Sequence, residues 1–100
     1  MSVLYVSGPM SGIDHLNFPA FAFASRKLRE VGHVVINPAE NWGGKKDVPR
    51  ATCMRQDIQQ VLLADGLAML HGWENSAGAR LERQIAAELQ LDIRPWKEWL

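Results

Sequence analysis

The sequence predicts a small doubly wound α/β domain, in which helices cover both faces of a parallel sheet of four or five strands. Short apolar runs rich in β-branched residues alternate with longer segments of helical periodicity. Each strand-like run is apolar throughout, which is typical of parallel strands buried on both faces. With 100 residues and 47% hydrophobic side chains, the chain is large enough to bury its own core. We therefore expect one domain over residues 1–100.

The first elements are a strand, a helix and a second strand. The run VLYVS (3–7) is apolar, and the glycines and proline that follow end it, so we expect a buried strand. Asn17 is a candidate N-cap for the first helix because Pro19 stands just inside it. Gly32 closes this helix, and HVVIN (33–37) predicts the second strand.

The same alternation continues to the end of the chain. The remaining expected elements are a second helix from about Thr52, a third strand at 67–70, a third helix at 77–90, a short fourth strand around Ile93 and a last turn at 96–100. Right-handed crossovers between such strands give a Rossmann- or flavodoxin-like sheet. Ligands bind these sheets at the carboxyl ends of the strands. We expect that edge to be built from the loops at 7–17, 37–51 and 71–78.

Charge and cysteine content exclude several classes of partner. Eleven basic and eleven acidic side chains cancel, so no long-range field attracts a nucleic-acid polymer or an anionic membrane. No apolar run approaches the ~18 residues of a membrane span, and the N-terminus lacks a leader pattern. The single cysteine, Cys53, cannot form an internal disulfide. These features predict a cytoplasmic protein without a membrane span.

Two acids fall on faces where acids are rare. Glu82 lies in the middle of a small or apolar stripe of the third helix, and Asp57 borders the apolar stripe of the second. Both stand within about two turns of helix starts at the same sheet edge, so we expect them to face one cleft. The alternative is that each acid only interacts favourably with its helix macrodipole, worth about 0.3–1 kcal/mol.

Two loops at this edge are candidate oxyanion sites. Asn75-Ser76-Ala77-Gly78 leads into the helix of Glu82, where Ser76 is a candidate N-cap and Gly78 permits close approach. The segment SGPMSG (7–12) follows the first strand in the same way. Neither loop is an established nucleotide motif, and a plain tight turn is the alternative for each. The histidines and the cysteine lack the spacing of metal ligands, so we expect no metal.

Other aromatic and thiol groups raise further alternatives. Tyr5 lies within the first strand, so its hydroxyl needs a buried partner, either the carboxylate of Glu82 or a backbone carbonyl. Trp73, in an edge loop, is a candidate for stacking on a base. Trp96 and Trp99 are expected to pack in the core or at a subunit interface. Cys53 is expected to be a small buried hydrophobe, with a reactive thiol as the alternative.

Four segments resemble a known family: YVSGPMSG, NPAE, MRQDI with LLADGLAML, and above all GWENSAGARLE. They resemble nucleoside 2-deoxyribosyltransferase-like proteins, most closely a small branch often encoded by phages and bacteria. The wider family includes deoxynucleoside-monophosphate N-glycosidases. Its pattern extends to Asp57 and Asp65, and the resemblance runs from Tyr5 to about Ile93.

The resemblance implies a role for each candidate residue. Glu82 matches the nucleophilic glutamate that holds the sugar as a covalent ester, Asp57 an acid that helps the base depart, and Tyr5 the tyrosine that orients the nucleophile. The implied substrate-binding residues are Ser7, Gly8, Met10, Ser11, Gly12, Asn17, Trp73, Ser76 and Gly78. No cofactor is implied. Because a neighbouring subunit often completes the site in the transferases, a homo-oligomer is expected.

The chain also departs from the family pattern. Relatives usually have a glycine after the last helix, where this chain reads Gln90-Leu91-Asp92. The loop after the first strand lacks an arginine that several phosphate-binding relatives use. Lys45 or Lys46 is a candidate substitute, and a solvated loop lysine is the alternative.

The chemistry of N-glycosidic bonds agrees with these roles. An oxocarbenium-like state needs a negative charge beneath the sugar and a proton for the departing base. We expect Tyr5 and the helix N-terminus to oppose the desolvation that raises the pKa of Glu82, and Asp57 to be useful when partly protonated. The expected function is cleavage or transfer of the N-glycosidic bond of a nucleoside or nucleoside monophosphate. The alternatives are a non-catalytic nucleotide-binding or sensing module and a phage-borne interaction protein.

Overall fold

The computed structural model describes residues 2–100, which contain one all-parallel sheet with the strand order β2-β1-β3-β4. The strands are β1 (Val3–Ser7), β2 (Val34–Ile36), β3 (Gly66–Met69) and β4 (Asp92–Pro95). The strand order reverses beside β1, because the chain passes from β2 over β1 to reach β3. This is a doubly wound, Rossmann-like α/β fold, as the alternation of elements predicts.

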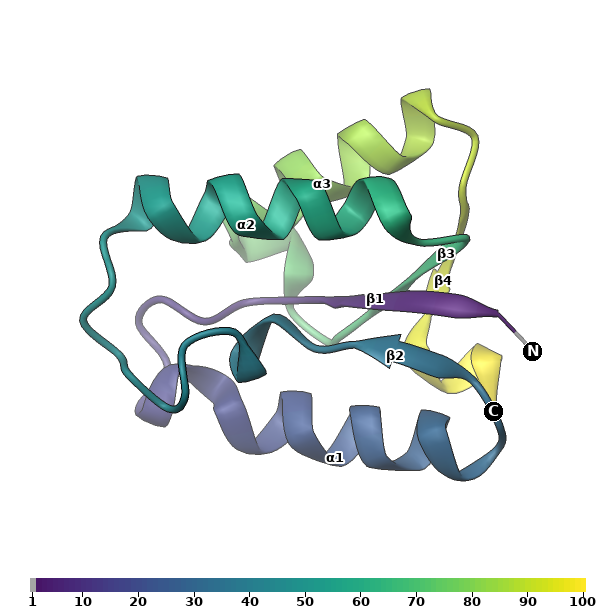
Figure 1. The fold of residues 1–100 in the computed structure, drawn as a ribbon, viewed down its shortest axis with the longest axis horizontal. Helices are drawn as coiled ribbons and strands as arrows, with labels where there is room; N and C mark the ends of the chain where they lie inside the picture. Colours follow the sequence, from purple (N-terminus) through teal and green to yellow (C-terminus); the bar gives the residue numbers. More distant parts are fainter. Residues whose placement is uncertain (1) are drawn as a thin grey trace.

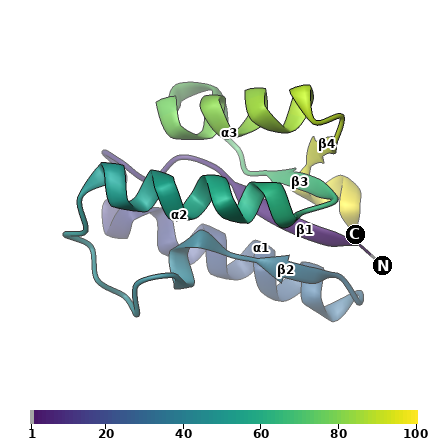
Figure 2. The ribbon, with the colours of Figure 1, turned by 45° about the horizontal axis from the view of Figure 1, so that its top comes forward.

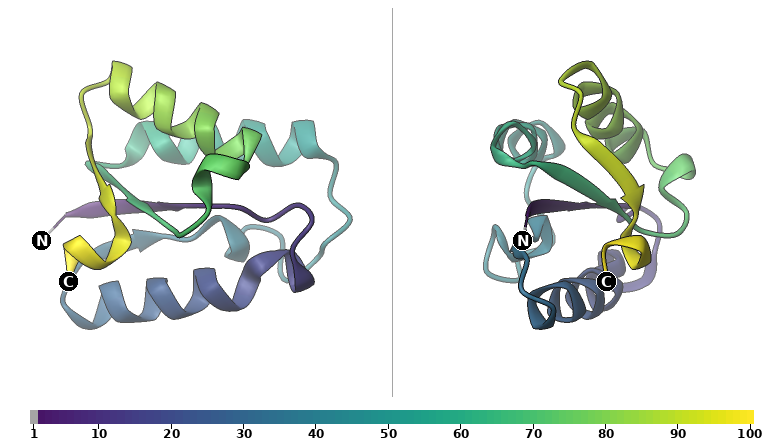
Figure 3. Two further views of the ribbon diagram at one scale, coloured as in Figure 1. Left: turned by 180° about the vertical axis from the view of Figure 1, so that it is seen from behind. Right: turned by 90° about the vertical axis from the view of Figure 1, so that its right-hand side faces the viewer.

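Helices cover both faces of the sheet. The helix α1 (Phe18–Glu30) lies on one face together with the final 3₁₀ turn η4 (Trp96–Trp99). The helices α2 (Arg50–Leu63) and α3 (Ala77–Glu88) lie side by side on the other face, and the end-on view of Figure 3 shows these three layers. Of the helices formed by residues 2–100, none has the length and apolar character needed to cross a bilayer.

Alternate residues of β1 face opposite layers. Leu4 and Val6 pack with Phe21 in the core beneath α1, whereas Tyr5 packs with Val61 in the core beneath α2 and α3. Successive side chains of a strand point to opposite faces, so a strand covered on both sides must be apolar at every position. The same alternation places Ser7 on the face of Tyr5.

The tryptophans near the end of the chain pack onto the core of their own domain. Trp96 and Trp99 contact the apolar cluster beneath α1, and Trp99 Nε1 donates a hydrogen bond of 3.0 Å to the carbonyl of Leu67. Gly66 makes room for this ring, because a Cβ atom there would lie 2.7 Å from ring carbons of Trp99. Core packing and a subunit interface were both expected for these indoles, and the structure places them against the core.

Two helix ends differ from the prediction. The helix α2 begins at Arg50 instead of Thr52, since its first turn is exposed and carries no apolar signal. The helix α3 ends at Glu88 instead of Gln90, because Gln90 adopts a left-handed conformation with φ of +59°. The N–H of Leu91 then bonds the carbonyl of Ala86, which is the bond pattern of a Schellman motif.

Asn17 occupies the predicted N-cap position of α1, but it does not make the capping hydrogen bond that was expected. Its backbone has a φ of +61°. Its amide instead donates a hydrogen bond of 3.0 Å to the carbonyl of Pro9. The side chain therefore ties the loop after β1 to the start of α1.

The connection between β2 and α2 is the longest in the fold. It begins with the 3₁₀ turn η2 (Pro38–Glu40) and then extends beyond the end of the sheet before α2 starts, as Figure 2 shows. This loop and the segments after β1 and β3 meet at the carboxyl edge of the sheet, beside the reversal of strand order. A doubly wound sheet binds ligands at this place.

Candidate functional site

The buried carboxylate of Glu82 is held through both of its oxygens. The hydroxyl of Tyr5 donates a hydrogen bond of 2.9 Å to Oε2, and the hydroxyl of Ser7 donates one of 2.7 Å to Oε1. Tyr5 and Ser7 are two residues apart on β1, so both side chains face α3. Only 5% of Glu82 is exposed, and the two hydroxyls supply the partners that a buried carboxylate needs.

Burial nevertheless dominates the acidity of this group. Desolvation raises the pKa of Glu82 to about 7, and the negative charge of Asp57 adds to the rise. The hydrogen bonds from Ser7 and Tyr5 lower the pKa without cancelling the effect of burial. The hydrogen bonds therefore oppose the effect of burial, as expected, but they only partly offset it. With a pKa of about 7, the carboxyl of Glu82 is about half ionised at neutral pH. Burial and the charge of Glu82 also raise the pKa of Tyr5 well above its ordinary value, so its hydroxyl keeps its proton.

Asp57 of α2 provides a second acid at the same place. Burial raises the pKa of Asp57 to about 6, against the lowering effect of a hydrogen bond from the side-chain amide of Asn41. That bond joins Asn41 Nδ2 to Asp57 Oδ1 over 3.2 Å. Asp57 and Glu82 line one cleft, as their positions near two helix starts predicted.

The cleft has a volume of about 320 Å³, within the usual range of small-molecule sites, about 300–1,000 Å³. Tyr5, Asp57 and Glu82 form its polar floor. Its walls are largely apolar and aromatic: Met10, Leu16, Phe18, Phe21, Pro38, Trp42, Val48 and Met54. Glu82 is buried and Asp57 is partly buried, and the residues around them are apolar or aromatic. This combination suits a ligand with a flat ring and a polar, reactive centre.

The segment before α3 forms one side of the cleft. Ser76 caps this helix as predicted, because its Oγ accepts a hydrogen bond of 3.2 Å from the N–H of Ala79. Gly78 lies against Met54, whose sulfur would be 3.4 Å from a Cβ atom at this position. On the opposite side, Gly8 passes so close to Leu70 that a Cβ atom would lie 2.6 Å from it. Gly8 is therefore required for this close approach, whereas a Cβ atom at Gly78 would make only an ordinary van der Waals contact.

Cations line the cleft between β2 and α2. Lys45, Lys46 and Arg50 all contribute to its lining. Within residues 2–100 none of the three pairs with a carboxylate, and Lys46 Nζ lies 3.2 Å from Nδ1 of His15. The site therefore combines two acids with three positive charges that no carboxylate neutralises within residues 2–100, in a chain whose net charge is zero.

Several predicted residues meet at the cleft and others do not. Gly8, Met10, Ser11, Ser76 and Gly78 line it, and Ser7 reaches it through Glu82. The lining does not include Gly12, Asn17 or Trp73.

The residues outside the cleft have other places in the fold. Asn17 borders a separate, more open depression of about 580 Å³. Trp73 packs against the core beneath α2 and α3, with the guanidinium of Arg83 over its ring at 5.0 Å. Asp65 lies at the opposite edge of the sheet, where its Oδ2 accepts a hydrogen bond of 2.9 Å from the N–H of Val3. Asp65 is therefore a structural residue.

Several residues of this site were not predicted from the sequence, among them Phe18, Trp42 and Arg50 of the lining and Asn41, which bonds Asp57. Trp42 is the indole in the cleft, where Trp73 was expected. Its position after the second strand was an available signal, because that loop reaches the same sheet edge. No sequence pattern pointed to Asn41, whose role depends on a contact with α2.

Cys53 also lines the cleft and is half-buried. Burial and the negative charge of Asp57 raise the pKa of its thiol, so the protonated thiol predominates at neutral pH. Among residues 2–100 there is no group of three or more side chains arranged to hold a metal ion.

Comparison with known proteins gives one family match. The family model covers residues 2–94, and its description is "Domain of unknown function (DUF4406)". Among curated proteins, none matches the chain. The matched segment contains every residue of the cleft and both of its acids. The chain therefore belongs to the DUF4406 family.

Proposed function

We propose that the protein cleaves or transfers the N-glycosidic bond of a nucleoside or nucleoside monophosphate through a covalent glycosyl intermediate on Glu82. The observation that carries this proposal is the carboxyl of Glu82, held by Tyr5 and Ser7 at the floor of a cleft that contains a second acid, Asp57. A carboxylate nucleophile beside a second carboxyl with a raised pKa is the pair that retaining glycoside-cleaving enzymes use.

In the first step, a Glu82 carboxylate oxygen forms a bond to C1′ of the sugar while the bond from C1′ to the base nitrogen breaks. The electron pair of the broken bond goes to the base, and Asp57 supplies the proton that neutralises it. The products are a glycosyl ester on Glu82, the free base and ionised Asp57. Each carboxylate oxygen has two lone pairs, so the bonds from Tyr5 and Ser7 leave one lone pair on each oxygen for the attack.

In the second step, ionised Asp57 accepts a proton from the incoming nucleophile, which bonds to C1′. The ester bond breaks, and its electron pair returns to the carboxylate of Glu82. Water as the nucleophile gives hydrolysis, and the N–H of a second base gives transfer. Atoms and charges balance, and both acids recover their starting states.

The acidities of the two groups suit this cycle. With pKa values of about 6 and about 7, Asp57 and Glu82 together hold close to one proton between these pH values. Two hydroxyl donors stabilise the anion of Glu82, whereas one amide donor contacts Asp57. In the free protein the higher pKa of Glu82 keeps the shared proton mainly on Glu82. The cycle requires this proton on Asp57 in the reacting complex, and the two hydroxyl donors to the Glu82 anion favour that transfer.

The cleft walls support recognition of a base and of an anionic group. Trp42 and Phe18 offer aromatic faces for a base, and stacking of this kind is worth about 1–3 kcal/mol. Lys45, Lys46 and Arg50 offer positive charge for a 5′-phosphate, beside the N–H groups at the start of α3.

Release of free base from a panel of nucleosides and nucleoside monophosphates, measured by chromatography, tests this function. Wild-type protein releases base, Glu82→Gln does not, and Glu88→Gln retains activity because Glu88 is exposed at the other end of α3. Intact mass after rapid quenching detects a glycosyl adduct in the wild type alone. Absence of base release by the wild type, or turnover that survives Glu82→Gln, rejects the proposal.

A nucleotide-binding module without turnover is the second candidate. The near-neutral pKa of Glu82 favours it, because a protonated carboxyl is a hydrogen-bond donor and no nucleophile. Stabilisation of the fold by nucleotides, seen as a higher melting temperature without base release, identifies this function.

Two wider expectations accompany the proposed function. We propose a cytoplasmic location, since the single cysteine suits a reducing compartment.

We also propose a homo-oligomer. Trp96 and Trp99 are committed to the core, but Leu62 and Leu63 at the end of α2 are 57% and 72% exposed and can contribute to an interface. A monomeric mass in light scattering contradicts the oligomer.

A further inference from the structure

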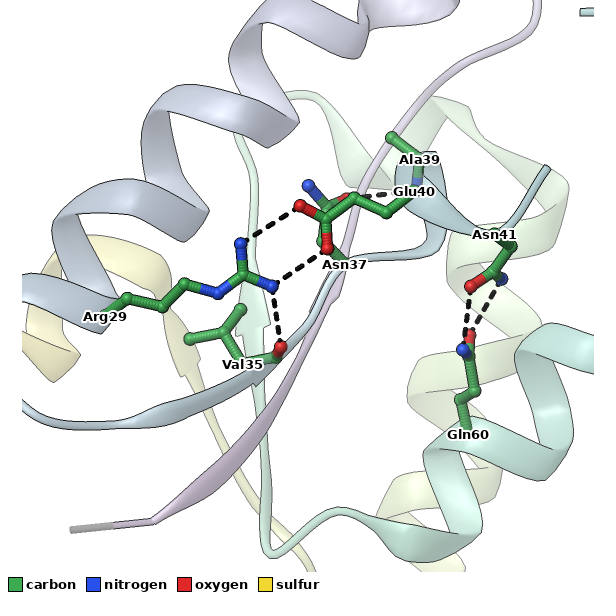
Figure 4. A network of polar contacts seen from close by, with 7 residues as sticks. All are labelled: Arg29, Val35, Asn37, Ala39, Glu40, Asn41 and Gln60. Carbon is green, nitrogen blue, oxygen red and sulfur yellow. Dashed lines mark hydrogen bonds and ion pairs between the residues drawn. The ribbon is translucent and has the colours of Figure 1, made fainter. Parts of the chain in front are cut away.

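A pair of side-chain amides stands behind Asp57. Asn41 Nδ2 donates a hydrogen bond of 2.9 Å to Gln60 Oε1, and Gln60 Nε2 donates one of 2.8 Å back to Asn41 Oδ1. Figure 4 shows the two amides facing each other, Asn41 after η2 and Gln60 on α2. The Nδ2 atom of Asn41 also donates the bond of 3.2 Å to Asp57 Oδ1.

The pairing with Gln60 and the bond to Asp57 together use every polar group of the Asn41 side chain. Its two N–H hydrogens are both used, one on Gln60 and the other on Asp57, and its oxygen accepts from Gln60. Rotation of the Asn41 amide alone would place its oxygen against the carboxylate of Asp57 and lose both bonds with Gln60. Gln60 therefore holds the Asn41 amide in place, and the carboxylate of Asp57 selects the orientation that offers it a donor.

The backbone that carries Asn41 is held from the other side of the sheet. Arg29 of α1 donates two hydrogen bonds to Glu40, of 3.0 and 2.9 Å, and a third of 2.9 Å to the carbonyl of Val35. Asn37 caps the start of η2, where its Oδ1 accepts a bond of 2.9 Å from the N–H of Ala39. Figure 4 shows this network beside the amide pair. These bonds tie the turn before Asn41 to α1 and β2.

We propose that Asn41, oriented by Gln60, is a positioning residue for Asp57 that occupies Oδ1 and leaves Oδ2 to exchange the proton with the ligand in the cleft. Within residues 2–100, Asp57 accepts no other hydrogen bond. A carboxyl with one oxygen committed to an amide donor binds its proton on the other oxygen. The proposal rests on the proposed function, in which Asp57 protonates the departing base.

Other charged groups face Asp57 and must be kept constant in a test. Glu82 of α3 and the hydroxyl of Tyr5 of β1 interact with it electrostatically, and Cys53 lies one turn earlier on α2. Lys45, Lys46 and Arg50 share the cleft lining. Substitutions at Asn41 and Gln60 leave all of these groups in place.

Titration of the Asp57 carboxyl by ¹³C NMR, in protein labelled at aspartate, tests the positioning role without any substrate. Asn41→Ala removes the donor, so the midpoint for Asp57 rises by about one pH unit. Gln60→Ala frees the Asn41 amide to rotate and gives a smaller rise. Gln59→Ala, a neighbouring exposed glutamine of α2, leaves the midpoint unchanged. Asn41→Asp keeps the size of the side chain but replaces the donor by a charge, and it gives the largest rise.

An unchanged Asp57 midpoint in folded Asn41→Ala, or equal effects of Gln60→Ala and Gln59→Ala, overturns the proposal. If the wild type releases base, the limb of its pH–rate profile assigned to Asp57 moves upward in the same order of variants. If the wild type releases no base, the proposed function fails, and the NMR midpoints still decide whether Asn41 positions Asp57. Circular dichroism of each variant verifies that it is folded.

Discussion

Ser7 donates a hydrogen bond of 2.7 Å to Oε1 of Glu82 across a separation of 75 residues. The strand β1 and the helix α3 meet at this bond, on the face of the sheet that also carries Tyr5. The contact stabilises the ionised form of a buried carboxyl, so it connects the packing of the sheet with the acidity of the site.

Loss of this bond should change the pH dependence of turnover. Ser7→Ala removes a donor that lowers the pKa of Glu82, so the pKa rises further above 7 and the acid limb of the profile moves upward. A hydrogen bond to a charged group is worth about 1.5–3 kcal/mol, so kcat/KM at pH 6 falls about tenfold or more. The measurement is kcat/KM from pH 5 to 9.

Ser25→Ala is the matched control. Ser25 is buried to the same extent as Ser7, with 1% exposed, but its hydroxyl has no hydrogen-bond partner within residues 2–100. Its removal leaves the pH profile unchanged and increases the free energy of unfolding by up to ~1 kcal/mol. A profile shift in this variant would show that the effect at Ser7 is a general consequence of core substitution.

Stability should fall as pH rises through the range in which Glu82 ionises. The folded pKa of about 7 exceeds the ordinary value of 4.5, so the folded chain binds more protons than the unfolded chain between these values. The contribution is fully present below pH 4.5 and lost above pH 7, and its size is about 3 kcal/mol. Asp57 acts in the same direction. Urea unfolding at pH 5 and pH 8 measures the loss, and Glu82→Gln should reduce it.

The cations of the cleft should discriminate between phosphorylated and free nucleosides. Lys46→Gln removes a positive charge that no carboxylate pairs with among residues 2–100. Loss of about 1 kcal/mol of binding free energy should raise KM for nucleoside monophosphates about fivefold. KM for free nucleosides stays constant, and the difference shrinks at high salt. Lys97→Gln, outside the cleft, provides the control. Equal changes for both classes of substrate would argue against a phosphate contact.

The two candidate indoles can be separated by substitution. Trp42→Ala removes an aromatic wall of the cleft and should raise KM about tenfold, since stacking on a base is worth about 1–3 kcal/mol. Trp73→Ala should leave KM unchanged and lower stability, because its ring belongs to the core beneath α2 and α3. The reverse result would restore Trp73 as the base-stacking residue. Steady-state kinetics and thermal unfolding measure the two effects.

Two helices end in the same motif with different residues in the left-handed position. Gly32 after α1 has a φ of +100°, and Gln90 after α3 has a φ of +59°. Gln90→Gly should therefore stabilise the protein by about 0.5–1 kcal/mol, and Gly32→Gln should destabilise it by a similar amount. A Cβ atom at Gly32 meets nothing within 4 Å, so this comparison isolates the backbone term. Thermal unfolding of both variants measures it, and stabilisation by neither glycine would contradict it.

The sequence predicted the elements well because their signals are local. The apolar runs at 3–7 and 67–70 differ from the observed strands by at most one residue at each end. The predictions of the cap of α1 and of the end of α3 were wrong because each depends on the backbone angles of one residue. Asn17 and Gln90 are left-handed, and the surrounding loops determine this conformation. A capping residue was read correctly at Ser76, where the helix itself supplies the partner.

The sequence by itself determined the order of elements, the two-sided sheet and the presence of an acid on the buried stripe of α3. These follow from periodicity, which each segment carries alone. The sequence offered Glu82 as one of two partners for Tyr5 and placed Asp57 in the same cleft. Only the packing of β1, α2 and α3 selected the bond from Tyr5 and added the one from Ser7. It also decided that Trp42 and Asn41 belong to the site. The direction of a loop side chain and the desolvation of a carboxyl both depend on neighbours that are distant in the sequence. A local sequence pattern therefore cannot predict them.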